Sequence, residues 1–524
     1  MHFRKPLSFL TPILLAAPFA AAQSPVPPVP TDSQEPALIS EQLGDVDQRI
    51  GGDGTTGRPD RVRRMPVGPP PQPWKGLFYN NDFSYKNNCC APSLFGDSLK
   101  DMRVDDAGFL GGMSISFGGE TRFRYMDEDN RLRLGGPGRT TYDLWRLRNY
   151  LDVKFDNGVR IYLEGLDASI HDEELPITPI DENAFDLQNG FIDLEIAERD
   201  CKPVILRAGR QELLFGSQRL VSPLDWSNTR RNFEGISLIS KGAAWDFHAF
   251  MTRPVNTGSG HPNLQQWRRK FDHPDYNRTF SGVYSSYHGV ENNTIDLYWL
   301  WLNADRERAD RVDGKRHTMG IRWAGKSSVL DECCEQVGLW SWDFEGAYQF
   351  GREASQDVAA AMLTGWVDYK MTNTPWTPSV KGLFYWGTGD RDAGDNENNT
   401  FQQLFPLGHA YWGIIDNLSG QNLQDFSVQT AVQPTKKLKL MTQVHWFHLD
   451  QGTDVLYNVA GAPIGAAGNG TDVGNEIDLI ANYAFNPNFS VQVAGQWFFY
   501  GKYVDRAVPR DDATQVYVQT QLRY

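Results

Sequence analysis

The sequence predicts a transmembrane antiparallel β-barrel of about 18 strands, preceded by an irregular periplasmic extension. Alternating segments of about ten residues recur from Met113 to the end of the chain, with no long helical pattern between them. The last such segment, 513–524, ends on the aromatic Tyr524, as expected of a closing strand with an aromatic residue at the membrane rim. Beyond the first residues, no apolar run approaches the roughly 20 residues of a spanning helix.

The bulk composition is compatible with this fold and excludes other classes. A mean hydropathy of −0.49 suits a barrel, because lipid-facing and water-facing residues alternate and average out. With 65 Asp and Glu against 51 Lys and Arg, the chain is too acidic for a nucleic-acid partner. Aromatic residues make up 12% of the chain, including 16 Trp, which suits girdles at two membrane interfaces. A secreted carbohydrate-active enzyme would also be rich in aromatic residues.

The chain divides into four regions. Residues 1–22 have the basic start, apolar stretch and small-residue cleavage site of a signal peptide. Residues 23–73 are rich in Pro and Gly and predict a disordered tether. Aromatic residues return in 74–112, a periplasmic pre-barrel segment that we expect to pack on the barrel's periplasmic mouth. Residues 113–524 form the barrel, which places the protein in the outer membrane of a Gram-negative-type cell with its N-terminus in the periplasm.

The strands follow from alternation and from parity. In such barrels periplasmic turns are short, extracellular loops are long and both chain ends lie in the periplasm. Counts from the two ends of the chain agree only if the weakly alternating stretch 279–287 is a strand of its own. Asn157-Gly158 predicts a tight hairpin. The expected strands are 114–125, 143–155, 159–167, 187–196, 204–211, 233–240, 243–251, 279–287, 293–303, 316–323, 338–350, 357–369, 379–387, 425–432, 437–448, 476–485, 489–500 and 513–524.

From residue 74 to the end, the chain resembles the alginate export family of outer-membrane barrels. The most specific stretches are RAGRQELLFGSQRL at 207–220 and DWSNTRRNFEG at 225–235. FQQLFPLGHAYWG at 401–413 and KGLFYNNDFSY at 75–85 are further similarities. The resemblance implies a monomeric barrel whose arginine-lined lumen conducts a polyuronate outward. The long Pro-rich tether departs from the simplest members of that family, and the family includes relatives whose substrate need not be alginate.

Arginines and one glutamine are the candidate substrate-binding residues. A charge on the lipid face near the bilayer midplane costs roughly 2–4 kcal/mol, so strand arginines should face the lumen. A planar guanidinium binds a carboxylate bidentately and stays charged, which suits a series of weak uronate sites. Strict alternation would turn Arg210 away, but it lies near the strand end. The candidates are Arg122, Arg124, Arg146, Arg148, Arg207, Arg210, Gln211, Arg219, Arg230, Arg231, Arg316 and Arg322.

Each of these assignments has a structural alternative. Lumen arginines also pair with lumen acids such as Glu120, Asp152 and Glu195 and then only hold the wall rigid. The arginines at 219, 230 and 231 lie in a long extracellular loop, which either folds into the lumen as a constriction or ends in a solvated tip.

The cysteines cluster on one side by parity. Cys89, Cys90, Cys201, Cys333 and Cys334 all fall on the periplasmic side, an oxidising compartment. We expect Cys89 or Cys90 to bridge to Cys333 or Cys334 and pin the pre-barrel segment beneath the barrel. Zinc binding is the alternative, although adjacent pairs lack the spacing of zinc ligands.

An acidic extracellular loop is the one candidate cofactor site. Asp390, Asp392, Asp395 and Glu397 offer hard oxygen ligands that suit a structural Ca²⁺ ion. The spacing lacks that of an EF-hand, and an acidic solvated loop is the alternative. We expect no other cofactor.

Together these patterns favour an outer-membrane channel for an anionic polysaccharide or a related acidic solute. A general porin for uptake of small solutes is the first alternative, and a secreted β-rich polysaccharide-active enzyme is the second. The chain has neither a G-x-S-x-G elbow nor an H-E-x-x-H motif, so we expect no enzymatic activity. The region before Met113 is too short for the folded plug of a TonB-dependent transporter. The expected partners are outer-membrane lipid, the transported solute and periplasmic export proteins.

Overall fold

The computed structural model describes residues 72–88, 91–105, 108, 111–133, 136–178, 180–257, 271–305 and 313–524. These residues belong to one structural unit, Glu35–Tyr524. The predicted signal peptide (1–22) and residues 23–71 of the predicted tether lie outside the described residues.

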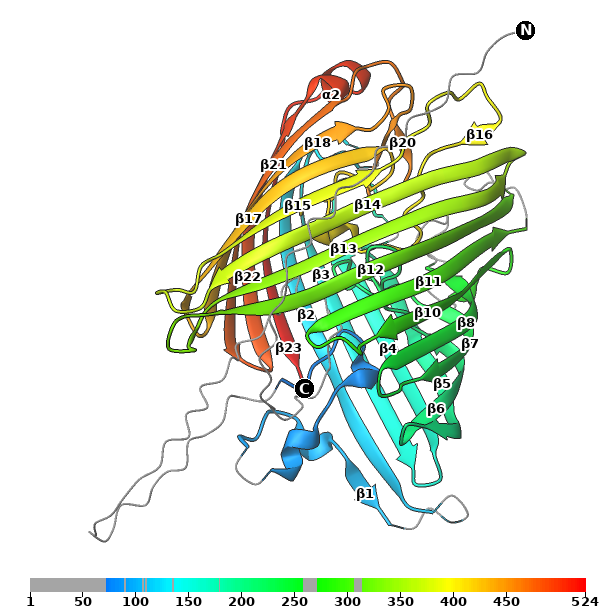
Figure 1. The fold of residues 1–524 in the computed structure, drawn as a ribbon, viewed down its shortest axis with the longest axis vertical. Helices are drawn as coiled ribbons and strands as arrows, with labels where there is room; N and C mark the ends of the chain where they lie inside the picture. The colour runs from blue at the N-terminus through cyan, green and yellow to red at the C-terminus, as the bar shows by residue number, and fades with distance from the viewer. Residues whose placement is uncertain are drawn as a thin grey trace. The chain divides into compact units, whose positions relative to one another are not determined.

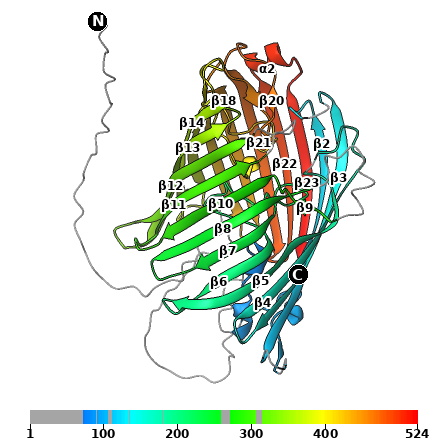
Figure 2. The ribbon, with the colours of Figure 1, turned by 90° about the vertical axis from the view of Figure 1, so that its right-hand side faces the viewer.

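Eighteen antiparallel strands form a closed barrel, so the predicted fold class is confirmed (Figures 1 and 2). Each strand pairs with its neighbours in sequence, and the last pairs with the first. The strands of the wall are β2 (Met113–Asp129), β3 (Arg139–Phe155), β4 (Val159–His171), β5 (Asn183–Arg199), β6 (Lys202–Gln211), β7 (Phe233–Ser240), β8 (Trp245–Asn256), β10 (Arg278–Tyr287), β11 (Asn293–Ala304), β12 (Gly314–Leu330), β13 (Gln336–Glu353), β14 (Gln356–Met371), β15 (Ser379–Gly387), β17 (Leu423–Thr435), β18 (Leu438–Leu449), β21 (Asp472–Asn486), β22 (Phe489–Tyr500) and β23 (Ala513–Arg523).

The closing seam lies between β2 and β23. Its register runs from Glu120 opposite Arg523 to Asp129 opposite Thr514. Beyond the last strand, the backbone of Tyr524 exchanges two hydrogen bonds with Gly119, at 2.8 and 3.0 Å. The last strand is therefore hydrogen-bonded to the first, and the sheet closes on itself instead of ending in two free edges.

Alternation sorts the side chains of the wall into two faces. On β3, Trp145, Leu147 and Leu151 are exposed, whereas Arg146 and Arg148 between them are buried. On this strand the inner face is thus polar and the outer face apolar. Among the described residues, no helix is long and apolar enough to cross a membrane.

The connections at the two ends of the barrel differ in length. At the end where β2 begins and Tyr524 lies, here the turn end, connections are short, as at 156–158 between β3 and β4. Gly158 has a φ of +84°, as the Asn-Gly hairpin requires. At the opposite end, the loop end, the connections are longer and carry the short helix α2 (Lys502–Ala507; Figure 2). The smaller elements are β1 (Met102–Val104), β9 (His273–Pro274), β16 (Glu397–Asn398), β19 (Leu456–Tyr457), β20 (Pro463–Ile464), η1 (Phe78–Asn80), η2 (Ser84–Asn87), η3 (Asp97–Leu99) and η6 (Gly408–Ala410).

Two of the long connections fold into the barrel. Loop A (residues 212–232) joins β6 to β7, and loop B (residues 388–422) joins β15 to β17. They meet at a parallel bridge between Val221 and Phe405. Their apolar side chains form the largest hydrophobic core together with inward-facing aromatics of the wall, such as Tyr284 and Tyr385. The interior is therefore packed rather than an open tube.

The pre-barrel segment also goes further in than expected. Figure 1 shows it in blue at the turn end, near the C-terminus. β1 lies beside the first residues of β2 and pairs with them in the antiparallel sense, with Met102 opposite Ile115. Before β1, Trp74, Phe78 and Tyr79 are buried, and Tyr79 packs edge-on against Tyr162 of β4 and Phe191 of β5. The segment thus enters the barrel, because these rings find aromatic partners on the inner wall.

Candidate functional site

Arginines on β2 and β3 donate hydrogen bonds to the backbone of loop A. Arg122 donates from Nη1 to the carbonyl oxygen of Asp225 at 2.7 Å, and Arg146 donates to the same oxygen at 3.0 Å. Arg124 donates to the Trp226 carbonyl at 2.8 Å, and its guanidinium lies 3.5 Å from the centre of the Trp226 ring. We call Arg122, Arg124 and Arg146 the arginine cluster.

The side chain of Asp225 completes this arrangement. Its Oδ1 accepts a hydrogen bond from Arg146 Nη2 at 2.8 Å and another from Arg230 of loop A. Burial alone would raise the pKa of Asp225, but Arg230, Arg146 and Arg122 together hold that pKa well below its usual value. A loop carboxylate therefore sits, ionised, between two guanidinium groups of the interior.

A second group of predicted arginines meets the pre-barrel segment. Arg148 pairs with Glu164 at 2.6 Å and lies 3.8 Å from the ring centre of Phe78. Arg207 binds Asp193 through two hydrogen bonds of 2.7 and 2.8 Å and lies 4.4 Å from the ring centre of Tyr79. These arginines thus bind an acid on the wall and present a flat face to an aromatic ring.

On the opposite wall, arginines bind acids of β11 and β13. Arg219 of loop A donates to Asp343 at 2.8 Å and to Glu345 at 2.9 Å. Arg322 bridges Asp343 and Asp296 at 2.8 and 2.7 Å. Nearer the loop end, Arg316 pairs with Glu353 at 2.7 Å and donates to the Thr400 carbonyl of loop B at 3.1 Å.

The remaining candidates lie at or beyond the end of β6. Arg210 pairs with Asp186 at 3.0 Å and with Glu234 at 3.3 Å. Gln211 accepts a hydrogen bond from Ser237 at 2.8 Å. Arg231 donates to the carbonyl of Pro406 in loop B at 3.3 Å. These contacts tie the two loops and the strand ends together.

Both alternatives weighed from the sequence occur in part. Glu120 pairs with Arg146 at 2.6 Å, and Asp152 pairs with Arg160 at 2.7 Å, whereas Glu195 is exposed. The arginines at 219, 230 and 231 lie within a buried loop rather than at a solvated tip. The sequence indicated the arginines but not their partners in loop A and the pre-barrel segment, because such contacts join residues far apart in the chain, 103 and 154 positions in two examples.

Loop B is fixed to the wall at a glycine. The backbone N–H of Ile415 donates to Glu476 of β21 at 2.8 Å. Two residues earlier, Gly413 has a φ of +86°, and a Cβ there would lie 2.1 Å from an Oε atom of Glu476. Both the backbone conformation and the close approach therefore require glycine.

We expect Gly413→Ala to lower the free energy of unfolding by about 1–3 kcal/mol, because loop B must shift away from Glu476. Gly468→Ala is the matched control: Gly468 has a similar φ of +83°, but no atom lies within 4 Å of its added Cβ. Denaturant titration of both variants in detergent checks the difference. Equal losses would mean that backbone strain alone acts at Gly413.

The predicted disulfide and calcium site stay predictions. Cys201, Cys333 and Cys334 are exposed and free, and Cys89 and Cys90 lie outside the described residues. The acidic stretch from Asp390 to Glu397 lies in loop B and ends at the first residue of β16. Across the described ranges, no group of three or more His, Cys, Asp or Glu residues is arranged to hold a metal ion.

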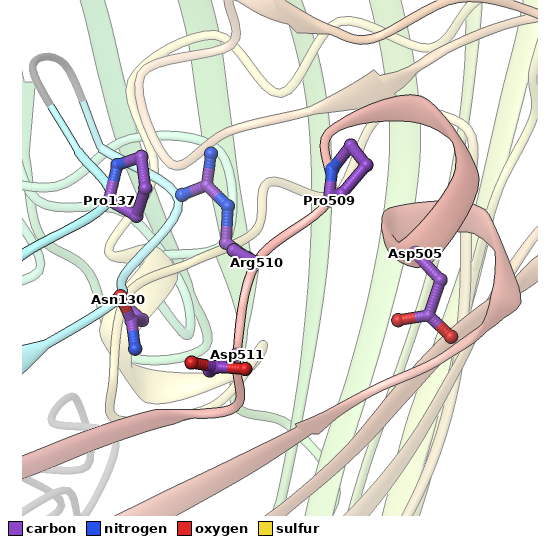
Figure 3. A pocket seen from close by; sticks show the side chains of 6 residues that line it. All are labelled: Asn130, Pro137, Asp505, Pro509, Arg510 and Asp511. Carbon is purple, nitrogen blue, oxygen red and sulfur yellow. The ribbon is translucent and has the colours of Figure 1, made fainter.

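Two pockets of the described residues lie away from the arginine cluster. A shallow pocket of about 410 Å³ lies at the loop end, where Arg510 extends towards Pro137 (Figure 3). Arg510 also donates to the Arg131 carbonyl at 2.7 Å, so this pocket is formed by crossing loops. A second pocket of about 260 Å³ lies at the turn end between the pre-barrel segment and β2 and β3.

Comparison with known proteins finds solved structures of similar fold and a matching sequence family. Among solved structures of similar fold are OprD of Pseudomonas aeruginosa (11% identity, TM-score 0.51) and OccK8 (OprE) of the same organism (11% identity, TM-score 0.52). The aligned region covers 78% of this chain in both cases, and 95% and 98% of the respective structures. No curated protein matches the sequence.

These likenesses show the fold alone, a closed antiparallel β-barrel. The family is shown by the sequence itself, because the alginate export family matches residues 113–518. That match spans the whole wall from the first residue of β2 into β23. The chain is therefore an outer-membrane channel protein and belongs to the alginate export family.

Proposed function

We propose that the protein passes an anionic polysaccharide, an alginate-like polyuronate or a related acidic solute, through an arginine-lined lumen. The observation that carries this proposal is the carboxylate of Asp225 between Arg146 and Arg230. A uronate residue bears the same group as an aspartate side chain. Loop A thus occupies, with its own carboxylate, the kind of site that a polyuronate needs.

The arrangement along the barrel supports passage rather than tight binding. From the turn end towards the loop end, Arg207 of β6 and Arg148 of β3 come first and the arginine cluster comes next. Arg316 lies near the loop end. Most of these arginines also pair with an acid, which weakens any one site for a passing anion. Conduction needs such weak, repeated sites, because each must release what it binds. Passage also requires loops A and B to move, since they fill the interior.

The other functional assignments belong to the same proposal. We infer that the protein works as a monomer in outer-membrane lipid, with its turn end facing the periplasm and any export partners there. We infer that it catalyses no reaction, since its family and fold are those of channels.

Single-channel recording in planar bilayers tests the proposal. We expect oligouronates to block the open channel, while neutral oligosaccharides of equal length do not. In Asp225→Asn, the competing carboxylate is lost, so we expect about tenfold tighter block, from the removal of one charge-assisted contact worth about 1.4 kcal/mol.

Asp127→Asn is the control, because Asp127 pairs with Arg139 near the start of β3 and lies outside the arginine cluster. Block of equal strength by neutral and acidic oligosaccharides would overturn the proposal and favour a general porin.

A further inference from the structure

We propose that residues 73–88, here the inner segment, form a displaceable plug that closes the barrel from its turn end. The plug is autoinhibitory: it covers Arg148, Arg207 and Arg230, which a passing solute must reach. This inference does not depend on which solute is carried.

The inner segment is anchored by two adjacent aromatic residues. Phe78 and Tyr79 are 3% and 7% exposed, and their rings cover the guanidinium groups of Arg148 and Arg207. The carbonyl oxygen of Tyr79 accepts a hydrogen bond from Arg160 at 2.7 Å. Three arginines on β3, β4 and β6 are thus engaged by two residues of the segment.

The contacts of the inner segment differ in kind from the strand pairings that hold the wall together. The inner segment contains only the short turns η1 and η2, and β1 is its nearest strand, with three residues paired to β2. Towards the arginines it offers ring faces and carbonyl oxygens, which are weaker partners for a guanidinium than a carboxylate. The four arginines that contact the segment, Arg148, Arg160, Arg207 and Arg230, keep their acidic partners when it leaves, so its departure leaves none of them unpaired.

The inner segment is also linked to loop A. Arg230 donates to the Gly76 carbonyl at 3.0 Å with the same guanidinium that binds Asp225 and Glu212. The hydroxyl of Tyr79 donates to the backbone carbonyl of Glu212 at 2.7 Å. Withdrawal of the segment therefore removes two supports of loop A. We therefore expect loop A, which otherwise fills the interior, to move when the segment withdraws, so that both obstacles to passage are released together.

The test compares full-length variants in liposomes by swelling in a neutral pentose, so that recognition of anions plays no part. We expect Phe78→Ala/Tyr79→Ala to admit the sugar about tenfold faster than the unmodified protein, as for a two-state plug whose closed state loses its anchors. Phe95→Ala is the matched control, because Phe95 lies in the same region but is 66% exposed. We expect it to leave swelling unchanged.

Heat-modifiable gel mobility shows whether each variant is folded. Unchanged swelling in a folded double variant would overturn the plug. If the double variant does not fold, Tyr79→Phe decides: it keeps the ring but removes the hydroxyl with its hydrogen bond to Glu212, and faster swelling supports the plug whereas no change rejects it. Failure of the oligouronate block would refute the proposed function without affecting this result.

Discussion

We expect Arg146→Gln to lower the free energy of unfolding by about 3 kcal/mol, the low end of the cost of breaking a buried ion pair. Arg146 binds Glu120 at 2.6 Å and Asp225 at 2.8 Å, and both Arg146 and Glu120 have fully buried side chains. Glutamine removes the charge but keeps some of the side-chain volume. The loss of stability therefore measures the cost of leaving the carboxylates of Glu120 and Asp225 without the charge of Arg146. Arg523 lies 3.3 Å from Glu120 and prevents a larger loss.

Arg139→Gln on the same strand is the matched control. Arg139 pairs with Asp127 at 2.6 Å, but its side chain is 68% exposed. Exposed pairs contribute about 0–1 kcal/mol, so we expect little change. Guanidinium titration of protein folded into lipid vesicles, followed by gel mobility, measures both variants. Equal losses would show that the Arg146 pair is no more important than a surface pair.

The wall of the barrel could be predicted because its information is local. Alternation and parity together placed all the strands, and the structure extends most of them at one or both ends, by up to seven residues. The least regular of them, 279–287, was needed to make the two chain ends lie on one side, and it is β10 (Arg278–Tyr287). Parity thus compensated for a weak local pattern, since an odd number of strands would place the two chain ends on opposite sides of the membrane.

The side of the wall on which each side chain lies could be predicted for the same reason, but the residues that pack against it could not. Arg122, Arg124 and Arg146 are buried and the apolar residues between them are exposed or half-exposed, as alternation requires. What lies against these arginines depends on loop A and the inner segment, which have no periodic pattern. The aromatic sequence at 75–85 indicated packing near the barrel, yet its depth follows only from the three-dimensional positions of Tyr162 and Phe191.

A charge introduced on the lipid-facing side of the wall is expected to have the second large effect on stability. Leu363 lies near the middle of β14, opposite Gly346 of β13, and is 52% exposed. Leu363→Arg would place a charge near the bilayer midplane, and we expect a loss of about 2–4 kcal/mol in the free energy of unfolding.

Leu330→Arg separates this effect from the mere loss of an exposed leucine. Leu330 is 55% exposed but ends β12 at the turn end, where an arginine reaches the interface, so we expect a loss of about 0–1 kcal/mol. Unfolding titrations of both variants in lipid vesicles measure the two losses. In detergent micelles the difference should shrink, because a micelle admits water more readily than a bilayer does. If Leu363→Arg cost no more than Leu330→Arg in vesicles, the exposed apolar face of β14 would not lie at the depth that the barrel assigns to it.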